Sequence, residues 1–358
     1  MYKFLLIEDA KEDADACIDT IKRMNIELEE ERFQVVVSNT FSDALLELKN
    51  EYHGVIVDIK LDGEHSGNEI IRSIVNEYRV PVAVMTGTPD TELEENSPIH
   101  IYKKGEVTYE DIIKTLAKAT ATGLFNVLGG KGIIENAMNQ IFWNNLYPQI
   151  TLWEKQKDEG VDTERVLLRY AIAHIQELID NDIPSYATEE MYIKPPISDY
   201  IKTGAIVQSK HDGMYCIVLS PPCDLAMHND QIKTDRILVC EIDNQDSVNR
   251  EVAEKATKRE KKKNNIRDAI KNNYTDYYHW LPANSLFDGG YINFRNVITY
   301  PPQEFKEEFG APIIKIQEFF VKSILNRFSS YYARQGQPDF DFKIETDCIM
   351  ERICPTVE

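Results

Sequence analysis

The feature that most constrains the fold of this 358-residue chain is an alternation of apolar, β-branched runs with amphipathic segments in its first third. Between these runs, apolar residues recur at the three- and four-residue spacing of a helix that buries one face. The runs cover residues 2–7, 33–37, 55–58, 80–86 and 99–103, and a last helical segment covers 109–121. Because strands that alternate with helices pair in parallel, the pattern predicts an α/β fold, a doubly wound five-stranded parallel sheet.

Polar side chains follow four of these strands at the point where each strand ends. Glu8 and Asp9 follow the first strand, Asp58 the third, Thr86 the fourth and Lys103 the fifth. Functional groups in a parallel sheet collect just outside the carboxyl ends of the strands, so adjacent strands would bring these five groups together. Three neighbouring carboxylates repel one another unless a cation neutralises them, and their oxygens suit Mg²⁺. Taken alone, an Asp such as Asp58 is equally typical of a helix or turn cap.

This set of residues resembles the receiver domain of two-component response regulators, over about residues 1–122. The resemblance also rests on Gly67 and on the pair Lys103-Lys104. It implies a flavodoxin-like fold and phosphorylation of Asp58 by a histidine kinase or a related GHKL-type ATPase. It further implies Mg²⁺ held by Glu8, Asp9 and Asp58, with Thr86 and Lys103 contacting the phosphoryl group.

The sequence departs from the receiver pattern at four points. Lys103-Lys104-Gly105 leaves two lysines for one role, and we favour Lys103 because the strand period places it at the end of the strand. The loop from Asp58 to Gly67 is one residue longer than the common pattern and lacks its proline. The acidic segment 89–98 is too short for a full amphipathic helix, so we do not expect the usual receiver dimer face. His100 replaces the aromatic residue that normally precedes the lysine, which weakens the usual relay from the threonine to that residue more than it weakens phosphorylation.

Residues 123–198 are predicted to be a helical connector. Its glycines at 129, 130 and 132 favour a hinge or a helix C-cap over a phosphate-binding loop, because no GxxxxGK[ST] pattern is present. Two apolar helices, 133–153 and 166–179, would form a spacer that docks on the next domain or forms a homodimer contact.

Residues 199–358 are predicted to be an α+β output domain with a small β-barrel. Short strands at 202–207 and 214–219 are joined by Asp212-Gly213, which is a good hairpin signal. This region resembles, over about forty residues, the barrel of toxin-type endoribonucleases, and its Ser-Pro-x-Cys-Asp stretch resembles that of uncharacterised bacterial proteins. Cys223-Asp224 in that stretch is a candidate nucleophile, although a buried cysteine at a strand end is the commoner case.

A basic helical segment interrupts the output domain near residues 249–273. It carries nine Lys and Arg against four Asp and Glu, in a chain whose formal net charge is −20. A solvated, protruding helix explains this composition, and so does a surface for nucleic acid or an acidic protein.

Composition narrows the remaining choices. The negative charge argues against indiscriminate binding to nucleic acid or anionic membranes, and no apolar run is long enough to span a membrane. Six scattered cysteines without a CxxC motif indicate reduced thiols and a cytoplasmic protein. The sequence therefore predicts a response-regulator-like signalling protein, in which Asp58 controls an output module without a helix-turn-helix. The alternative is an effector with a nuclease-like barrel that the receiver regulates or docks; whether the output domain is an enzyme stays open.

Overall fold

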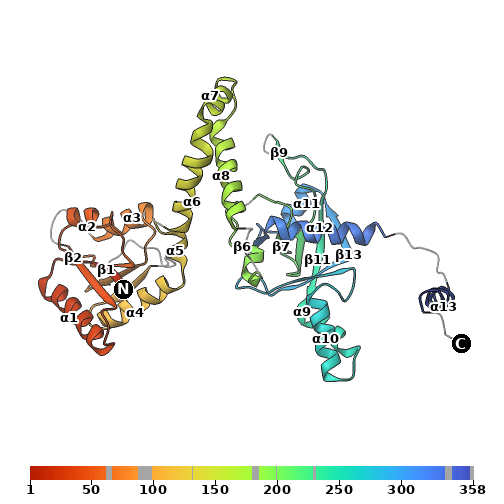
Figure 1. Ribbon diagram of the computed structural model, residues 1–358, viewed down its shortest axis with the longest axis horizontal. Coiled ribbons are helices and arrows are strands. Elements are labelled where there is room, and N and C mark those ends of the chain that lie inside the picture. The colour runs from red at the N-terminus through yellow and green to blue at the C-terminus, as the bar shows by residue number, and fades with distance from the viewer. Residues whose placement is uncertain are drawn as a thin grey trace. The chain divides into compact units, whose positions relative to one another are not determined.

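The computed structural model describes residues 1–61, 67–87, 99–130, 132–179, 185–198, 200–228, 231–334 and 341–354. The chain divides into two compact units, Met1–Ile183 and Pro184–Glu358 (Figure 1). The first unit contains the predicted receiver and most of the predicted connector. In the described ranges, no helix combines the length and the apolar character needed to cross a membrane.

The first unit is built on a five-stranded sheet in the order β2-β1-β3-β4-β5, and every neighbouring pair is parallel. Its strands are β1 (Tyr2–Ile7), β2 (Phe33–Ser38), β3 (Gly54–Val57), β4 (Val82–Thr86) and β5 (His100–Lys103). This is the flavodoxin-like order of a doubly wound sheet. The predicted fold class of the first third is thus confirmed.

Helices cover both faces of this sheet because successive strand residues point to opposite sides. Phe4 and Leu6 face one side and pack against α1 (Lys11–Glu27) and α4 (Tyr109–Ala121). Leu5 and Ile7 face the other side and pack against α2 (Phe41–Glu47) and α3 (Gly67–Glu77).

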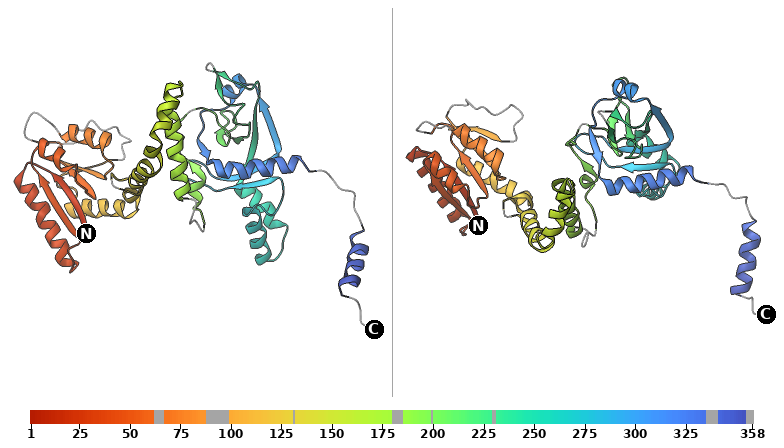
Figure 2. Two further views of the ribbon diagram at one scale, coloured as in Figure 1. Left: turned by 45° about the horizontal axis from the view of Figure 1, so that its top comes forward. Right: turned by 90° about the horizontal axis from the view of Figure 1, so that it is seen from above.

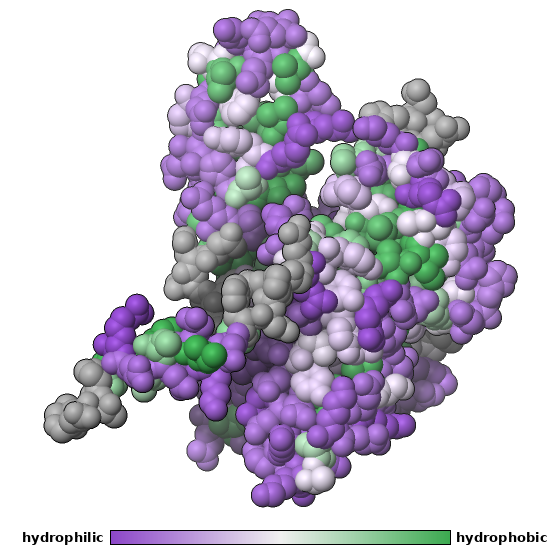
Figure 3. All heavy atoms as spheres, turned by 90° about the vertical axis from the view of Figure 1, so that its right-hand side faces the viewer, coloured by the Kyte–Doolittle hydropathy of each residue, from purple (hydrophilic) through white to green (hydrophobic). Residues whose placement is uncertain are grey.

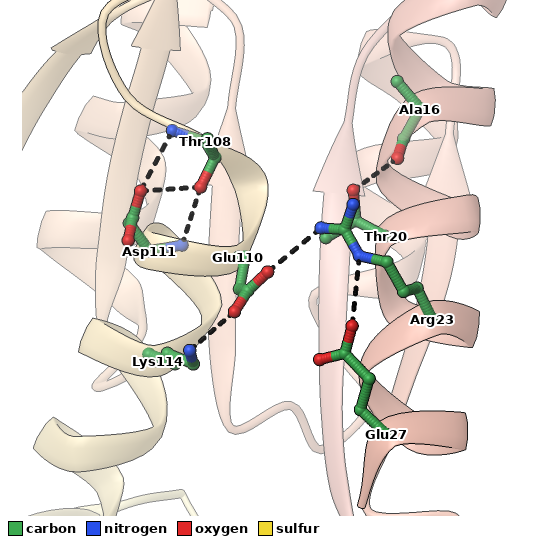
Figure 4. Close-up of polar contacts among 8 residues, drawn as sticks. All are labelled: Ala16, Thr20, Arg23, Glu27, Thr108, Glu110, Asp111 and Lys114. Carbon is green, nitrogen blue, oxygen red and sulfur yellow. Dashed lines mark hydrogen bonds and ion pairs between the residues drawn. The ribbon is translucent and has the colours of Figure 1, made fainter.

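Polar contacts also hold α1 beside α4 (Figure 4). Arg23 of α1 donates to Glu110 of α4 at 3.0 Å, and Lys114 donates to the other oxygen of the same carboxylate. Thr108 and Asp111 form a reciprocal capping box that fixes the start of α4, directly after the chain leaves β5. These contacts hold α1 and α4 against each other on one face of the sheet.

The connector begins with α5 (Leu124–Leu128) and α6 (Ile133–Ile141), continues through a π-turn (Phe142–Leu146) and a 3₁₀ turn (Tyr147–Gln149) into α7 (Ile150–Asp158), and returns along α8 (Thr163–Ile179) (Figure 1). Pro148 has no N–H to donate, which explains the interruption between α6 and α7. Gly129 ends α5 and Gly132 precedes α6, where an added Cβ would lie 2.7 Å from the Val127 carbonyl oxygen. The glycines therefore act as helix caps.

The second unit contains a seven-stranded antiparallel sheet that curls into a half-barrel, in the order β12-β13-β11-β8-β7-β14-β6. The strands are β6 (Tyr192–Ile193), β7 (Ala205–Gln208), β8 (Tyr215–Val218), β11 (Ile237–Asn244), β12 (Tyr278–Leu281), β13 (Gly290–Tyr300) and β14 (Ile314–Ile316), with a separate pair β9 (Met227–His228) and β10 (Gln231–Ile232). The predicted hairpin at Asp212-Gly213 joins β7 to β8, and Gly213 supplies the positive φ of 76° that such a turn requires.

Helices complete the second unit. Val321 and Ile324 of α12 (Glu318–Tyr332) pack into the core of the half-barrel. The predicted basic insertion forms α9 (Gln245–Glu254) and α10 (Arg259–Ile270), which project from the sheet in the left view of Figure 2 and pack on Tyr291. The other helices are α11 (Pro302–Glu308) and α13 (Phe342–Ile353).

Candidate functional site

Three of the predicted site residues end adjacent strands of the parallel sheet and are buried. Glu8 follows β1, Asp58 follows β3 and Thr86 ends β4; Glu8 is 1% exposed and Asp58 6%. The Asp58 amide donates to the Ile7 carbonyl at 3.0 Å, which holds the aspartate beside the end of β1. One of its carboxylate oxygens, Oδ1, accepts from the Lys60 amide at 3.2 Å.

The lysine that joins these acids is Lys104. Its Nζ donates to Glu8 Oε2 at 2.7 Å, to Asp58 Oδ2 at 2.7 Å and to Asp13 Oδ2 at 2.6 Å. Lys103 instead pairs with Glu106 at 2.9 Å, where both side chains are exposed. The predicted placement of Lys103 beside the acids is therefore wrong, because Lys104 lies there instead.

The alternation of side chains along β5 explains the difference. Tyr102 packs against the core that α1 and α4 cover, whereas Ile101 and Lys103 point outward. Lys104 has the same parity as Tyr102, and its amide donates to the Thr86 carbonyl at 2.9 Å. This bond ties the residue after β5 to the end of β4, so the Lys104 side chain reaches the acids.

Asp13 is a site residue that the sequence reasoning missed. It lies in the first turn of α1, the helix that follows β1. Its position is the signal that could have found it, because Asp13 is an acid in the first turn of a helix that follows a strand whose end carries site residues. Asp9 is half-buried at the same strand end, but the Lys104 ammonium contacts Asp13 in its place.

The electrostatics of the site are those of crowded acids around one cation. Burial, together with the Asp58 charge, raises the pKa of Glu8 despite its hydrogen bond from Lys104. Burial tends to lower the pKa of Lys104, but the hydrogen bonds to Asp13, Asp58 and Glu8 outweigh it and raise that pKa above its ordinary value. The ammonium is thus held in its charged form.

The same oxygens are the ones available to a metal ion. Within the ranges that the structure describes, no three Asp, Glu, His or Cys side chains form a ready-made metal site, since Lys104 takes the central position. Yet the donor set fits Mg²⁺, because three carboxylate oxygens already gather around a single cation at hydrogen-bonding distance. Glu8, Asp13 and Asp58 would hold such an ion in place of the Lys104 ammonium, and the ligand set Glu8, Asp9 and Asp58 stays a prediction.

Gly67 lets α3 approach the back of the site closely. Its amide donates to the Ile59 carbonyl at 2.9 Å, and an added Cβ would lie 2.1 Å from the Asp58 carbonyl oxygen. Only glycine fits this contact, which fixes the backbone that carries Asp58. The sequence features at 62–66 and 89–98 lie outside the described residues.

Cys223 is the candidate nucleophile of the second unit. It is exposed on the turn after β8, so the expectation of a buried cysteine is wrong. Its sulfur contacts Asp224 Oδ1 at 3.6 Å.

Comparison with known proteins finds similarity in the first third of the chain. A receiver domain of a CheY-like response regulator from Methylobacillus flagellatus is 19% identical over 32% of this chain and 98% of its own, with a TM-score of 0.25. The response regulator TrrA from Thermotoga maritima, solved with Mg²⁺ and BeF, is 18% identical over 34% of this chain and 99% of its own, with a TM-score of 0.25. DrrB, an OmpR/PhoB homologue from the same organism, is 18% identical over 34% of this chain and 54% of its own, with a TM-score of 0.27. No protein-family profile and no curated protein matches the chain.

Proposed function

We propose that the chain is a response-regulator-like signalling protein in which Asp58 accepts a phosphoryl group and thereby controls the second unit. The observation that supports this is the convergence of Glu8, Asp58, Thr86 and Lys104 at the carboxyl ends of adjacent parallel strands. The phosphoryl donor would be a histidine kinase or a GHKL-type ATPase.

In the proposed reaction, an Asp58 carboxylate oxygen attacks the phosphorus of the donor, and the donor's bond to phosphorus breaks as the acyl phosphate forms. Mg²⁺, when bound, would neutralise the phosphoryl oxygens and the acids. Lys104 leaves its contact with Asp58 and pairs with a phosphoryl oxygen, because that oxygen then carries the charge nearest to the ammonium. The Thr86 hydroxyl, buried at the end of β4, donates to another phosphoryl oxygen.

Incubation of the full chain with acetyl phosphate and Mg²⁺ tests this proposal. Intact-mass spectrometry should detect one phosphoryl adduct that hydroxylamine removes, because hydroxylamine cleaves acyl phosphates. Asp58→Asn should lack the adduct, and Asp19→Asn, which changes an exposed acid of α1, should keep it. A wild-type chain without an adduct, or an equal adduct in Asp58→Asn, would contradict the proposal.

A second observation concerns what the second unit binds. Arg259, Lys263, Arg267 and Lys271 recur every four residues along α10 and its last turn, so they form one row of cations spaced about 6 Å apart. Like charges at this spacing destabilise a helix, whereas a helix that is merely solvated gains from alternating signs. Among the ion pairs that described residues form, one involves a basic residue of 249–273, and it joins Lys255 to Glu251.

We infer that this row, here called the basic row, contacts the phosphates of a nucleic acid. A regular line of cations matches a regular line of phosphates better than it matches the irregular acids of a folded protein. The logarithm of the affinity for an oligonucleotide should then fall linearly with the logarithm of the salt concentration. Lys263→Glu with Arg267→Glu should abolish this binding, and Lys306→Glu with Lys322→Glu, on α11 and α12, should not. Binding to polyglutamate alone would assign the row to an acidic protein.

A further inference from the structure

Exposed apolar side chains are concentrated in the connector. The described residues include 35 large apolar side chains that are exposed, and 15 of them lie between residues 124 and 179. Figure 3 shows such side chains in green on the visible face of the helical hairpin at the top of the view. So many exposed apolar side chains in one segment are unusual on a surface that no other molecule covers.

The return helix of this hairpin, α8, has two apolar stripes. One stripe contains Thr163 and Ala171, which are buried, and packs against the other leg, where Tyr170 lies against Trp153. The second stripe consists of Leu168, Ile172, Ile175 and Ile179, and here it is called the outer stripe. Leu168 is 62% exposed, Ile172 56% and Ile179 52%.

The spacing of the outer stripe is that of a helix–helix seam. Its steps are four, three and four residues, which is the alternation found along the contact line of a coiled coil. The sequence of steps is identical when it is read from either end. An antiparallel copy of α8 therefore meets the stripe in register, with Leu168 opposite Ile179 and Ile172 opposite Ile175.

The first leg of the hairpin adds an aromatic cluster at its interruption. Phe142 stacks on Tyr147 and Trp143 packs edge-to-face against both, with ring centroids 5.0 to 5.6 Å apart. Trp143 is nevertheless 62% exposed. The three rings contact one another within six consecutive residues, so they form a single apolar protrusion whose outer face is exposed.

We propose that the hairpin formed by α6, α7 and α8 pairs with the hairpin of a second copy of this chain, through the outer stripe, as an antiparallel four-helix bundle. A second copy is the occupant because the stripe is self-complementary, as a two-fold interface requires. A stable interface buries about 800 Å² per partner, which is more than a stripe of four residues presents, so the pairing also covers exposed apolar side chains beside the stripe. Between residues 133 and 179, twelve large apolar side chains are exposed, three of them in the outer stripe and three in the aromatic cluster.

The oligomeric state of the full chain tests this pairing. Sedimentation or light scattering at micromolar concentration should give a dimer for the wild-type chain and a monomer for Leu168→Glu with Ile172→Glu. Val75→Glu is the matched control, because Val75 is 62% exposed on α3 and should leave the dimer intact. A monomeric wild type, or a stripe variant that stays dimeric, would overturn the proposal.

A disulfide experiment covers the case in which the glutamate variant fails to fold. In a background where the exposed Cys223, Cys348 and Cys354 are serine, chains with Ile172→Cys and chains with Ile175→Cys are mixed and oxidised. The antiparallel register predicts cross-linked heterodimers well in excess of homodimers. Homodimers of the Ile172→Cys chain in excess would refute the register, and no cross-link at all would refute the interface.

Discussion

Replacing Lys104 with methionine removes the ammonium that Glu8, Asp13 and Asp58 share, while it keeps most of the volume of the side chain. Without a cation, the three carboxylates repel one another in a partly buried pocket. We therefore expect Lys104→Met to destabilise the receiver when Mg²⁺ is absent, and Mg²⁺ to restore most of the loss.

The magnitude follows from the burial of each acid. Removing one partner of a buried ion pair costs about 3–5 kcal/mol. Glu8 and Asp58 are buried, but Asp13 is 41% exposed, so its contact counts only as a surface pair of about 1 kcal/mol or less. We expect a loss near the lower end, about 3 kcal/mol. Lys103→Met removes only the exposed pair with Glu106 and should cost less than about 1 kcal/mol.

Hydrogen exchange of the full chain, measured by mass spectrometry, locates the effect in the receiver. A loss of about 3 kcal/mol corresponds to roughly 100-fold faster exchange of the β1 and β3 amides, if these exchange through unfolding of the receiver. Mg²⁺ at about 100 times its dissociation constant returns about 2.7 kcal/mol. Equal exchange in Lys104→Met and the wild type, or the same acceleration in Lys103→Met, would refute the assignment of Lys104.

Three further predictions concern packing, protonation and thiol reactivity. Gly67→Ala should destabilise the receiver by about 1–3 kcal/mol in urea unfolding and lower the yield of acyl phosphate, whereas Gly87→Ala, which meets nothing within 4 Å, should do neither. Burial, with the Arg327 charge, lowers the pKa of His279 to about 3, so the unfolded chain binds a proton below about pH 6.5 that the folded unit refuses. The second unit should lose about 2 kcal/mol between neutral pH and about pH 5, measured by tryptophan fluorescence in urea, and His279→Leu should remove this loss. Iodoacetamide should label three thiols in the native chain and six after denaturation, because burial raises the thiol pKa values; the protected cysteines are Cys17, Cys216 and Cys240.

Glu8, Asp58 and Thr86 could be placed from the sequence because one rule governs all three. Parallel strands end at the same edge of a sheet, so the residue that ends each strand is brought there whatever the loops do. Lys104 could not be placed in this way. It lies one residue beyond an edge strand. Because Ile101 in that strand is apolar but exposed, the sequence does not show which alternate residues face the core, and a shift of one residue sends a side chain to the other face.

Asp13 and the half-barrel show a second kind of limit. The direction in which Asp13 points depends on how α1 is rotated on the sheet, and that rotation is fixed by packing of Cys17 and Ile21 rather than by local sequence. In the second unit, the hairpin from β7 to β8 is local and was predictable. The insertion of β14 between β7 and β6 joins segments more than a hundred residues apart, and no local pattern encodes it.

The hairpin dimer and the basic row, if both are present, make one joint prediction. A dimer carries two basic rows, so a nucleic acid long enough to reach both binds the second row at a high effective concentration. Leu168→Glu with Ile172→Glu should therefore weaken binding to a long duplex by about 100-fold or more. It should leave unchanged the binding of a short oligonucleotide that covers a single row of about 18 Å. Equal weakening for both ligands would mean that the hairpin variant damages the row itself, and no weakening for either would mean that the two rows bind independently. A loss of affinity that is confined to the long duplex would show that pairing through the connector, and not the second unit alone, sets how tightly the protein binds nucleic acid.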